Sequence, residues 1–236
     1  MKINASIVFL LATLSLTAFG TPVTDVSVGR KKDLNKRAPA FTDIKEFAKD
    51  TLSGKPSFEI CKKSKLTKAD GTQNKTPGPK GRTCVEAQLG EVPDITKMTS
   101  TIIVQPENGQ RIKAKKPFQI KILMSNIDLG NFDNPATQYN IFGQQLNKKG
   151  IIKGHSHVTI QDLGNGKKPP NAEKIDFFLG LNGEADKGSL SVTVTEGLSP
   201  GLKRLCTMSG SFSHQPLVMP VAQRGAQDDC IRFVVQ

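Results

Sequence analysis

Histidine is the residue type of this chain that best fits chemistry at a binding site. The chain has three histidines, His155, His157 and His214. The first two form an H-x-H pair at the start of a strand-like segment, and alternate residues of a strand point to one face. Two imidazoles on one face can chelate a metal, and His214 follows as a third ligand candidate. Such pairs are more often surface residues or structural ones, so a secreted metal-binding protein or metal-dependent enzyme is the alternative hypothesis, and we expect no cofactor.

The remaining catalytic patterns point away from an enzyme. The chain contains no G-x-S-x-G sequence, which presents the serine nucleophile of many hydrolases. Asp228 and Asp229 are neighbours, so their side chains diverge in an extended segment and do not form an acid/base pair. The glycine-rich stretches lack a following helix pattern, so none predicts a phosphate-binding loop. We therefore expect a protein that is not an enzyme.

The segments that must position the histidines have the composition of β-strands. Seven of them after residue 100 are short, rich in β-branched residues and bounded by glycine, proline and asparagine. No helix-period segment separates them, so we predict an all-β, antiparallel immunoglobulin-like β-sandwich at residues 100–236. The predicted strands are Ser100–Gln105, Phe118–Met124, His157–Leu163, Lys174–Leu181, Leu190–Thr195, Leu202–Phe212 and Cys230–Val235.

The N-terminus predicts export. An apolar run from Ile7 to Phe19 follows Lys2, and small residues at Ala18 and Gly20 suit a cut before Thr21. The run is too short to span a membrane. We expect a signal peptide at residues 1–20, a secreted, extracellular protein and no membrane anchor.

The cysteines fit that compartment. Cys61, Cys84, Cys206 and Cys230 form an even set, and an oxidising pathway favours disulfides over thiol catalysis or a zinc site. Three connectivities are open. Local pairing of Cys61 with Cys84 and of Cys206 with Cys230 is favoured, because each pair closes a loop of similar length. Loops of about 25 residues contribute roughly 3 kcal/mol each.

A basic lead at residues 21–37 has three interpretations. Lys36 and Arg37 form a dibasic site that a kexin-type protease would cut, leaving Ala38 as the mature N-terminus. The two basic clusters of the lead also resemble a nuclear import signal. The third interpretation is a solvated linker. The first two exclude each other, because a cut after Arg37 discards both clusters.

Residues 38–99 predict a short helical and loop-rich extension to the sandwich. Phe41–Leu52 places apolar residues at helical spacing. The stretch from Lys62 to Arg82 is lysine, glycine, proline and threonine with little that is apolar, which indicates a loop. Within it Asn74 begins an N-glycosylation sequon that is followed by Pro77.

Composition limits the partners. The net charge is +12, and 36% of the residues are hydrophobic. There are 12 Phe, 1 Tyr and no Trp, too few aromatic side chains for a groove that stacks bases or sugars. We therefore do not expect nucleic acid as a partner, and a host protein or self-association is the better expectation.

Three segments add a family resemblance. They are Gly154–Val158, Asp176–Leu181 and Gln215–Cys230. Together with the signal, the basic lead and the four cysteines, they resemble the rust transferred proteins and their relatives, some of which are mislabelled as ribosomal proteins. The resemblance covers residues 100–236. It implies a fungal effector that passes into the host cytoplasm or nucleus, forms filaments and inhibits papain-like cysteine proteases.

Three segments have the properties that protease inhibition and filament formation would need. Gly130–Gln138 and Leu163–Pro170 have the glycine and proline content of rigid inhibitory loops, although ordinary sandwich loops share it. Ser189–Thr195 is alternating and uncharged, so it would pair with another copy if it lay at a sheet margin.

Intact mass of the secreted protein tests the N-terminal predictions. Removal of the signal takes away one positive charge, and a cut after Arg37 takes away three more net charges, which leaves +8. We expect a product that begins at Ala38 and gains four units of alkylation only after reduction. A product that begins at Thr21 would contradict processing at Lys36 and Arg37, and glycosylation at Asn74 would appear as added mass.

Overall fold

The computed structural model describes residues 60–75, 77–78, 81–181, 183 and 188–236. All of them belong to one unit, residues 48–236. The signal peptide expected at residues 1–20, the lead at residues 21–37 with Lys36 and Arg37, and the helix expected at Phe41–Leu52 lie outside the described residues. None of the helices in the described ranges is long and apolar enough to cross a membrane.

The longer strands occupy the seven segments that the sequence predicts, and the all-β class is confirmed. They are β3 (Ser100–Gln105), β5 (Phe118–Ser125), β7 (Ile152–Asp162), β8 (Phe177–Leu181), β9 (Ser189–Val194), β10 (Gly201–Ser211) and β11 (Cys230–Val235). The sequence missed four strands of two residues, β1 (Thr67–Lys68), β2 (Thr83–Cys84), β4 (Arg111–Ile112) and β6 (Ile127–Asp128). Two 3-10 turns, η2 (Ile60–Lys62) and η4 (Ile95–Lys97), complete the described elements.

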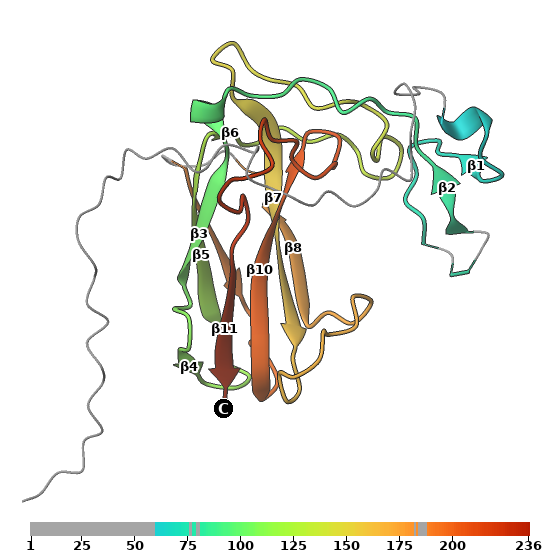
Figure 1. Cartoon of the computed structure of the whole chain (residues 1–236). Helices are drawn as coiled ribbons and strands as arrows, with labels where there is room; N and C mark the ends of the chain where they lie inside the picture. Colours follow the sequence, from blue (N-terminus) through green and yellow to red (C-terminus); the bar gives the residue numbers. More distant parts are fainter. Residues whose placement is uncertain (1–59, 76, 79–80, 182, 184–187) are drawn as a thin grey trace, which may run out of the picture. The chain divides into compact units, whose positions relative to one another are not determined.

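Two sheets face each other as a sandwich. The six-stranded sheet runs β4-β11-β10-β7-β6, with β8 paired to β7 as well, and the three-stranded sheet runs β3-β5-β9. In Figure 1 the strands β11, β10, β7 and β8 form one layer, and the green β3 and β5 belong to the other. The long strands pair antiparallel, as predicted, whereas the short β4 and β6 pair parallel to β11 and β7.

The core lies between these sheets because strand residues alternate between two faces. On β7 the side chains of Val158 and Ile160 are fully buried in the core cluster. Phe233 of β11 contacts Phe118 of β5 at 6.0 Å between ring centroids, which joins the two layers. The intervening residues of β7, including His157, therefore point to the outer face of the six-stranded sheet.

Strand β7 begins five residues earlier than the sequence predicts. The predicted strand starts at His157, and glycine is disfavoured inside a strand. In the structure Gly154 pairs with Ser211 of β10, and a Cβ at this position would lie 2.3 Å from the carbonyl oxygen of Gly210. The glycine thus permits a close approach of two backbones. The correction puts His155 inside the strand.

The disulfides join Cys61 to Cys84 and Cys206 to Cys230, the pairing that loop length favours. The second one links directly opposite residues of β10 and β11. Asn74 of the sequon is exposed, and its Nδ2 donates to Thr83 Oγ1 at 2.9 Å. Glycosylation there stays a prediction.

A buried ammonium group stabilises one end of β10. The Lys203 side chain is 2% exposed, and its Nζ lies 2.7 Å from Oδ2 of both Asp162 and Asp176. Burial acts to lower the pKa of Lys203, but the hydrogen bonds that its Nζ donates to the two aspartates raise the pKa above its ordinary value. The hydrogen bond from Lys203 lowers the pKa of Asp162.

Removal of both carboxylates should therefore be costly. We expect Asp162→Asn with Asp176→Asn to lower the free energy of unfolding at pH 7 by about 3–5 kcal/mol, because a buried charge loses its partners. Adding Lys203→Met should restore much of that loss, and denaturant titration measures both. Since the carboxyl pKa of Asp162 is lowered, the wild-type advantage is present at neutral pH and should shrink as the pH falls below about 4. An equal stability of double and triple variants would contradict this account.

Candidate functional site

The three histidines meet on the outer face of the six-stranded sheet. His155 and His157 are two residues apart on β7, so they share a face, as the sequence predicts. The register places His155 opposite Gly210 of β10, and His157 between Met208 of β10 and Gly180 of β8. The two glycines leave room beside the imidazoles.

His214 reaches the same place from the turn after β10. Its backbone N–H donates to the carbonyl oxygen of Ser211, which closes the turn, and its φ is +68°. A non-glycine residue in this left-handed region stores strain of about 1–2 kcal/mol. Such strain is found where a side chain must be aimed at a site. Here the turn aims the imidazole back at β7.

The imidazole nitrogens are close enough to share one ion. One ligand nitrogen from each histidine lies within 4.8 Å of the others, and His155 Nε2 is 2.9 Å from His214 Nδ1. Three nitrogens around a tetrahedral zinc ion, each about 2.0–2.1 Å from the metal, would lie about 3.4 Å apart. Closing the cluster around an ion needs shifts of an ångström or so.

Backbone carbonyls orient the rings. His214 Nε2 lies 2.8 Å from the Asp133 carbonyl oxygen, which only accepts, so this nitrogen carries the proton and His214 Nδ1 offers its lone pair. His155 Nε2 then donates to that lone pair when no ion is present. This leaves His155 Nδ1 buried without a hydrogen-bond partner. An unsatisfied buried nitrogen marks a site whose polar groups are incomplete without a ligand or a proton shift.

Burial favours the neutral forms of His155 and His157. The side chain of His155 is fully buried, and this desolvation, followed by repulsion from His157 and His214, lowers its pKa to about 3. Burial and then His214 lower the pKa of His157 as well. The backbone of Asn131 opposes the shift of His155, and that of Met208 opposes the shift of His157. Neutral imidazole is the form that binds a metal.

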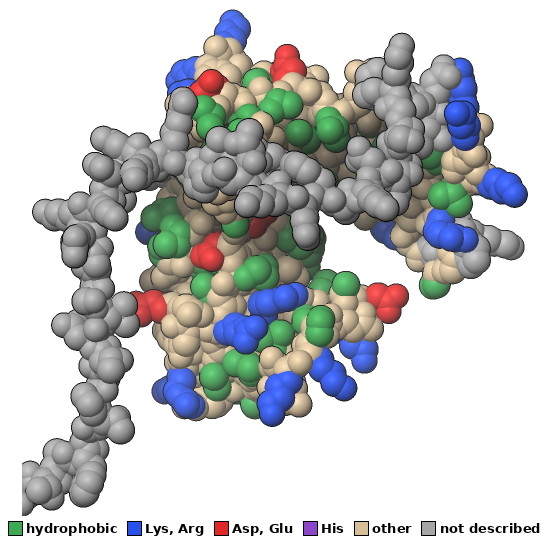
Figure 2. All heavy atoms as spheres, in the orientation of Figure 1, with side chains coloured by type: hydrophobic (Ala, Val, Ile, Leu, Met, Phe, Trp, Pro, Cys, Tyr) green, Lys and Arg blue, Asp and Glu red, His purple; other side chains and the backbone are tan. Residues whose placement is uncertain are grey.

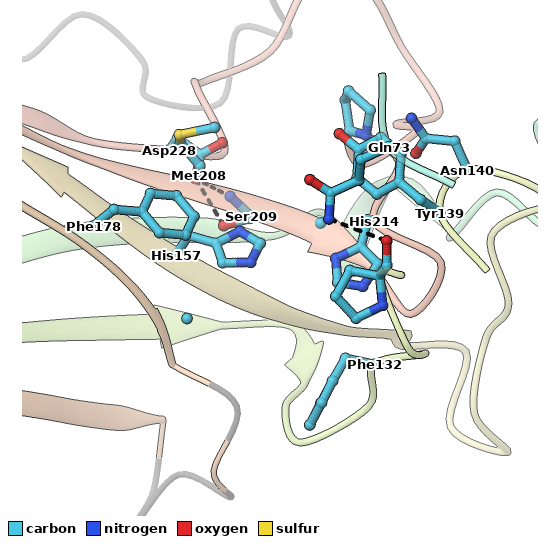
Figure 3. A pocket seen from close by; sticks show the side chains of 14 residues that line it. Gln73, Phe132, Tyr139, Asn140, His157, Phe178, Met208, Ser209, His214 and Asp228 are labelled. Atoms are coloured by element: carbon cyan, nitrogen blue, oxygen red, sulfur yellow. Dashed lines mark hydrogen bonds between the residues drawn. The ribbon is translucent and has the colours of Figure 1, made fainter. Parts of the chain in front are cut away.

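A cleft of about 780 Å³ opens over His157 and His214. Aromatic rings form its sides: Phe178 stacks on His157 at 5.2 Å, and Tyr139 lies 5.7 Å from His214. Figure 3 shows Phe178 and Met208 beside His157, and Tyr139 beside His214. His155 is fully buried, whereas His157 and His214 line the cleft, so the cleft is the route by which an ion would reach the cluster.

The carboxylate of the cleft is occupied by backbone and hydroxyl donors. Asp228 Oδ1 accepts hydrogen bonds from Ser209 N, Ser209 Oγ and Thr207 Oγ1 at 2.7–3.0 Å. Asp229 accepts from the backbone of Ile103 on β3 and so ties the two sheets together. The two neighbouring carboxylates therefore make separate contacts.

Several contributors to the site have no sequence signal. Asp133 acts through its backbone carbonyl, and Tyr139 through a ring contact, so neither residue type reveals its part. The loop that carries them is held by hydrogen bonds from Asp133 N to the Phe212 carbonyl oxygen and from Asn140 N to the Ser213 carbonyl oxygen. The sequence analysis considered Gly130–Gln138 of this loop as an inhibitory loop. In the structure the loop lies against the turn that carries His214.

Comparison with known proteins places the sandwich in a family. The model of the CLU5d N-terminal domain matches residues 101–236. Pathogenicity cluster 5 protein d of Colletotrichum graminicola is 41% identical over 182 residues, which cover 75% of this chain and 37% of that protein. The chain therefore spans little more than a third of the relative. These matches do not confirm the resemblance to the rust transferred proteins.

Solved structures add little. A β-glucosidase from Listeria innocua in complex with isofagomine aligns with 58% of this chain and 16% of its own, at 11% identity and a TM-score of 0.27. The same enzyme in complex with glucose gives 12% identity and a TM-score of 0.24. Scores this low do not inform the fold or the activity of this chain.

Stability of the metal-free protein should fall as acid is added. Because the folded pKa of His155 is about 3 and the unfolded value is 6.5, the unfolded state binds the proton first and stability decreases as the pH falls from 6.5. The slope should approach about 1.4 kcal/mol per pH unit. Denaturant titrations at pH 7, 6 and 5, where carboxylates stay ionised, measure it.

Matched variants isolate the histidine contribution. His155→Gln removes the titrating group and should flatten the dependence, and His157→Gln should flatten it in part. Identical slopes in the wild type and both variants would contradict lowered pKa values of His155 and His157.

Proposed function

This chain belongs to the family of the CLU5d N-terminal domain, and from that premise we propose that it is a secreted, virulence-related protein that acts by binding a divalent transition metal. The relative named as a pathogenicity cluster protein supports the virulence role. The two disulfides fit an oxidising, extracellular location. The metal site is His155, His157 and His214.

One observation carries the metal proposal: the three histidines of the chain converge within 4.8 Å. They come from two segments 57 or more residues apart, since His157 and His214 are separated by that distance in sequence. His214 adopts a strained backbone to reach the cluster. A chain that only buried its histidines would not need this strain.

The donor set selects the ion. Three neutral imidazoles suit zinc and copper, whereas magnesium and calcium prefer oxygen ligands. The carbonyl that accepts from His214 Nε2 supports the ligand from behind, in the manner of metal-binding histidines in general.

Binding fits the surroundings better than catalysis. An ion with one open position can act on a substrate, but a hydrolytic enzyme also needs a group that moves protons. In the part of the cleft that the structure describes, Asp228 is the acidic side chain, and its Oδ1 already accepts three hydrogen bonds. We therefore assign the site to metal binding.

The finer effector activities are further parts of this proposal. Strand β9 lies at the margin of its sheet among the described strands, the position that self-pairing into filaments requires. Inhibition of papain-like proteases is tested by titrating such a protease, and no loss of its activity at excess protein would reject it. Transfer into the host cytoplasm or nucleus is a prediction about the intact secreted chain.

Calorimetry with the full chain tests the metal site. After chelator treatment and dialysis, we expect zinc and copper to bind with a stoichiometry of one and magnesium to show no binding. The combined variant His157→Gln with His214→Asn should weaken zinc binding by about tenfold or more, because two of three ligands are lost. Asparagine tolerates the left-handed conformation of His214, which protects the fold.

A variant in the same cleft serves as the control. Gln73 lines the cleft on the side of His214 but contributes no imidazole, so Gln73→Ala should bind zinc as the wild type does. Binding that is unchanged in the double histidine variant would overturn the proposal. Replacing the gene with the double variant should also reduce infection, and undiminished infection would separate the metal from virulence.

A further inference from the structure

A second hollow lies on the outer face of the six-stranded sheet, next to the histidine cleft. Its volume is about 540 Å³, within the range of small-molecule sites. Phe178 and Met208 line both hollows, so the two are neighbours along the sheet. The residues that line the second hollow are Thr159, Gln161, Ala172, Ile175, Phe178, Arg204, Cys206, Met208 and Cys230. We call it the arginine hollow.

Large apolar side chains stand exposed in the arginine hollow. Ile175 is 51% exposed, Phe178 47% and Met208 49%. They come from β8, from the segment before it and from β10, yet they gather around one depression. In Figure 2 apolar and basic side chains lie side by side over the lower part of the molecule. Contiguous apolar surface of this kind marks binding sites more often than isolated exposed residues do.

Two guanidinium groups at this face have no acidic partner. The register places Arg204 of β10 directly opposite Arg232 of β11, and like charges in such a pair destabilise a sheet. Arg204 donates to Gln161 Oε1 at 2.6 Å, while its buried Nε has no partner. Within the described ranges neither arginine forms an ion pair with a carboxylate.

The nearby acidic groups are engaged elsewhere. Asp162 and Asp176 bind Lys203, and Asp228 binds Ser209 and Thr207. Positive charge on this face is therefore uncompensated by the strands that carry it. An anion that accepted hydrogen bonds from the Arg204 guanidinium would offset this positive charge.

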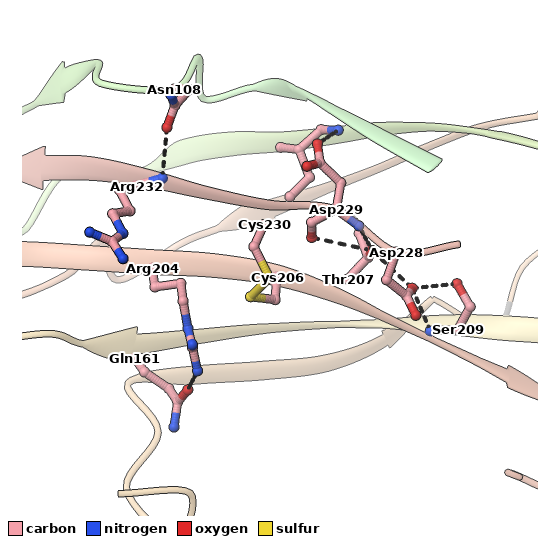
Figure 4. The surroundings of a disulfide bond; sticks show 11 residues. Asn108, Gln161, Arg204, Cys206, Thr207, Ser209, Asp228, Asp229, Cys230 and Arg232 are labelled. Carbon is pink, nitrogen blue, oxygen red and sulfur yellow. Dashed lines mark hydrogen bonds between the residues drawn. A yellow bond between two sulfur atoms is a disulfide. The ribbon is translucent and has the colours of Figure 1, made fainter. Parts of the chain in front are cut away.

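The disulfide holds the two arginines in place. Cys206 and Cys230 are opposite each other, two residues along the strands from the arginine pair and on the same face. Figure 4 shows Arg204 and Arg232 on neighbouring strands beside the disulfide, with Arg204 reaching Gln161. A covalent link beside a charged pair keeps the strands from separating under the repulsion.

We propose that the arginine hollow binds a small amphipathic carboxylate. Its carboxylate accepts hydrogen bonds from Arg204, and its apolar body lies on Ile175, Phe178 and Met208. Arg232 does not line the hollow but adds positive charge from the neighbouring strand. A planar carboxylate matches the guanidinium fork, and an apolar chain removes the exposed side chains from water. The proposal concerns residues other than the three histidines, so it stands or falls separately from metal binding.

Octanoate is a suitable probe for the full chain. By isothermal titration calorimetry at low salt we expect one octanoate to bind. Acetate, which lacks the apolar chain, and 1-octanol, which lacks the carboxylate, should each bind at least about tenfold more weakly. Arg204→Gln should weaken octanoate binding by about tenfold or more, because it removes the guanidinium that lines the hollow. Ile175→Asn, at a half-exposed position that tolerates a polar residue, should weaken it as well.

Two controls separate this site from the rest of the sheet. Arg111 lies on β4, and its guanidinium donates to Gln236, so Arg111→Gln removes an equal charge outside the hollow and should leave octanoate binding unchanged. The zinc-site variant His157→Gln with His214→Asn should also bind octanoate. Equal binding of octanoate and 1-octanol, or equal losses in the Arg111 and Arg204 variants, would overturn the proposal.

Discussion

The pairing of β7 with β10 is the constraint on which the rest of the structure depends. Each of these strands is 11 residues long, and their side chains alternate between the core and the outer face. A shift of one residue in this register would exchange the two faces, turning Val158 outward and His157 into the core. The buried isoleucine, valine and leucine side chains therefore fix the register, and the register fixes the sites on the opposite face.

The outer face of the six-stranded sheet carries polar groups in unfavourable arrangements, and the hydrophobic core supplies the stability that offsets them. Desolvated imidazoles, a left-handed turn at His214 and two facing arginines each cost free energy. A sandwich with fully buried Ile120, Ile160 and Phe233 provides stability against those costs. Unfavourable features gathered on one face of an otherwise ordinary domain are the pattern expected of a binding surface.

The long strands were predictable because their signal is local. β-Branched residues in short runs between glycine and proline mark a strand wherever its partner lies, so all seven segments were found. The two-residue strands have no such run, and the start of β7 was missed because Gly154 serves a contact with Gly210 that only the neighbouring strand creates. Cysteine pairing followed from loop length, since both pairs are close in sequence.

The sequence by itself determined the all-β class, the strand segments, the shared face of His155 and His157, and the candidacy of His214, because residue type and the two-residue period of a strand are local properties. Only the tertiary structure decided that a turn after β10 returns His214 to β7, and that the carbonyl of Asp133 orients it. The register of β10 and β11 likewise decided that Arg204 lies opposite Arg232. Contacts between segments distant along the chain depend on strand order, which no local pattern encodes.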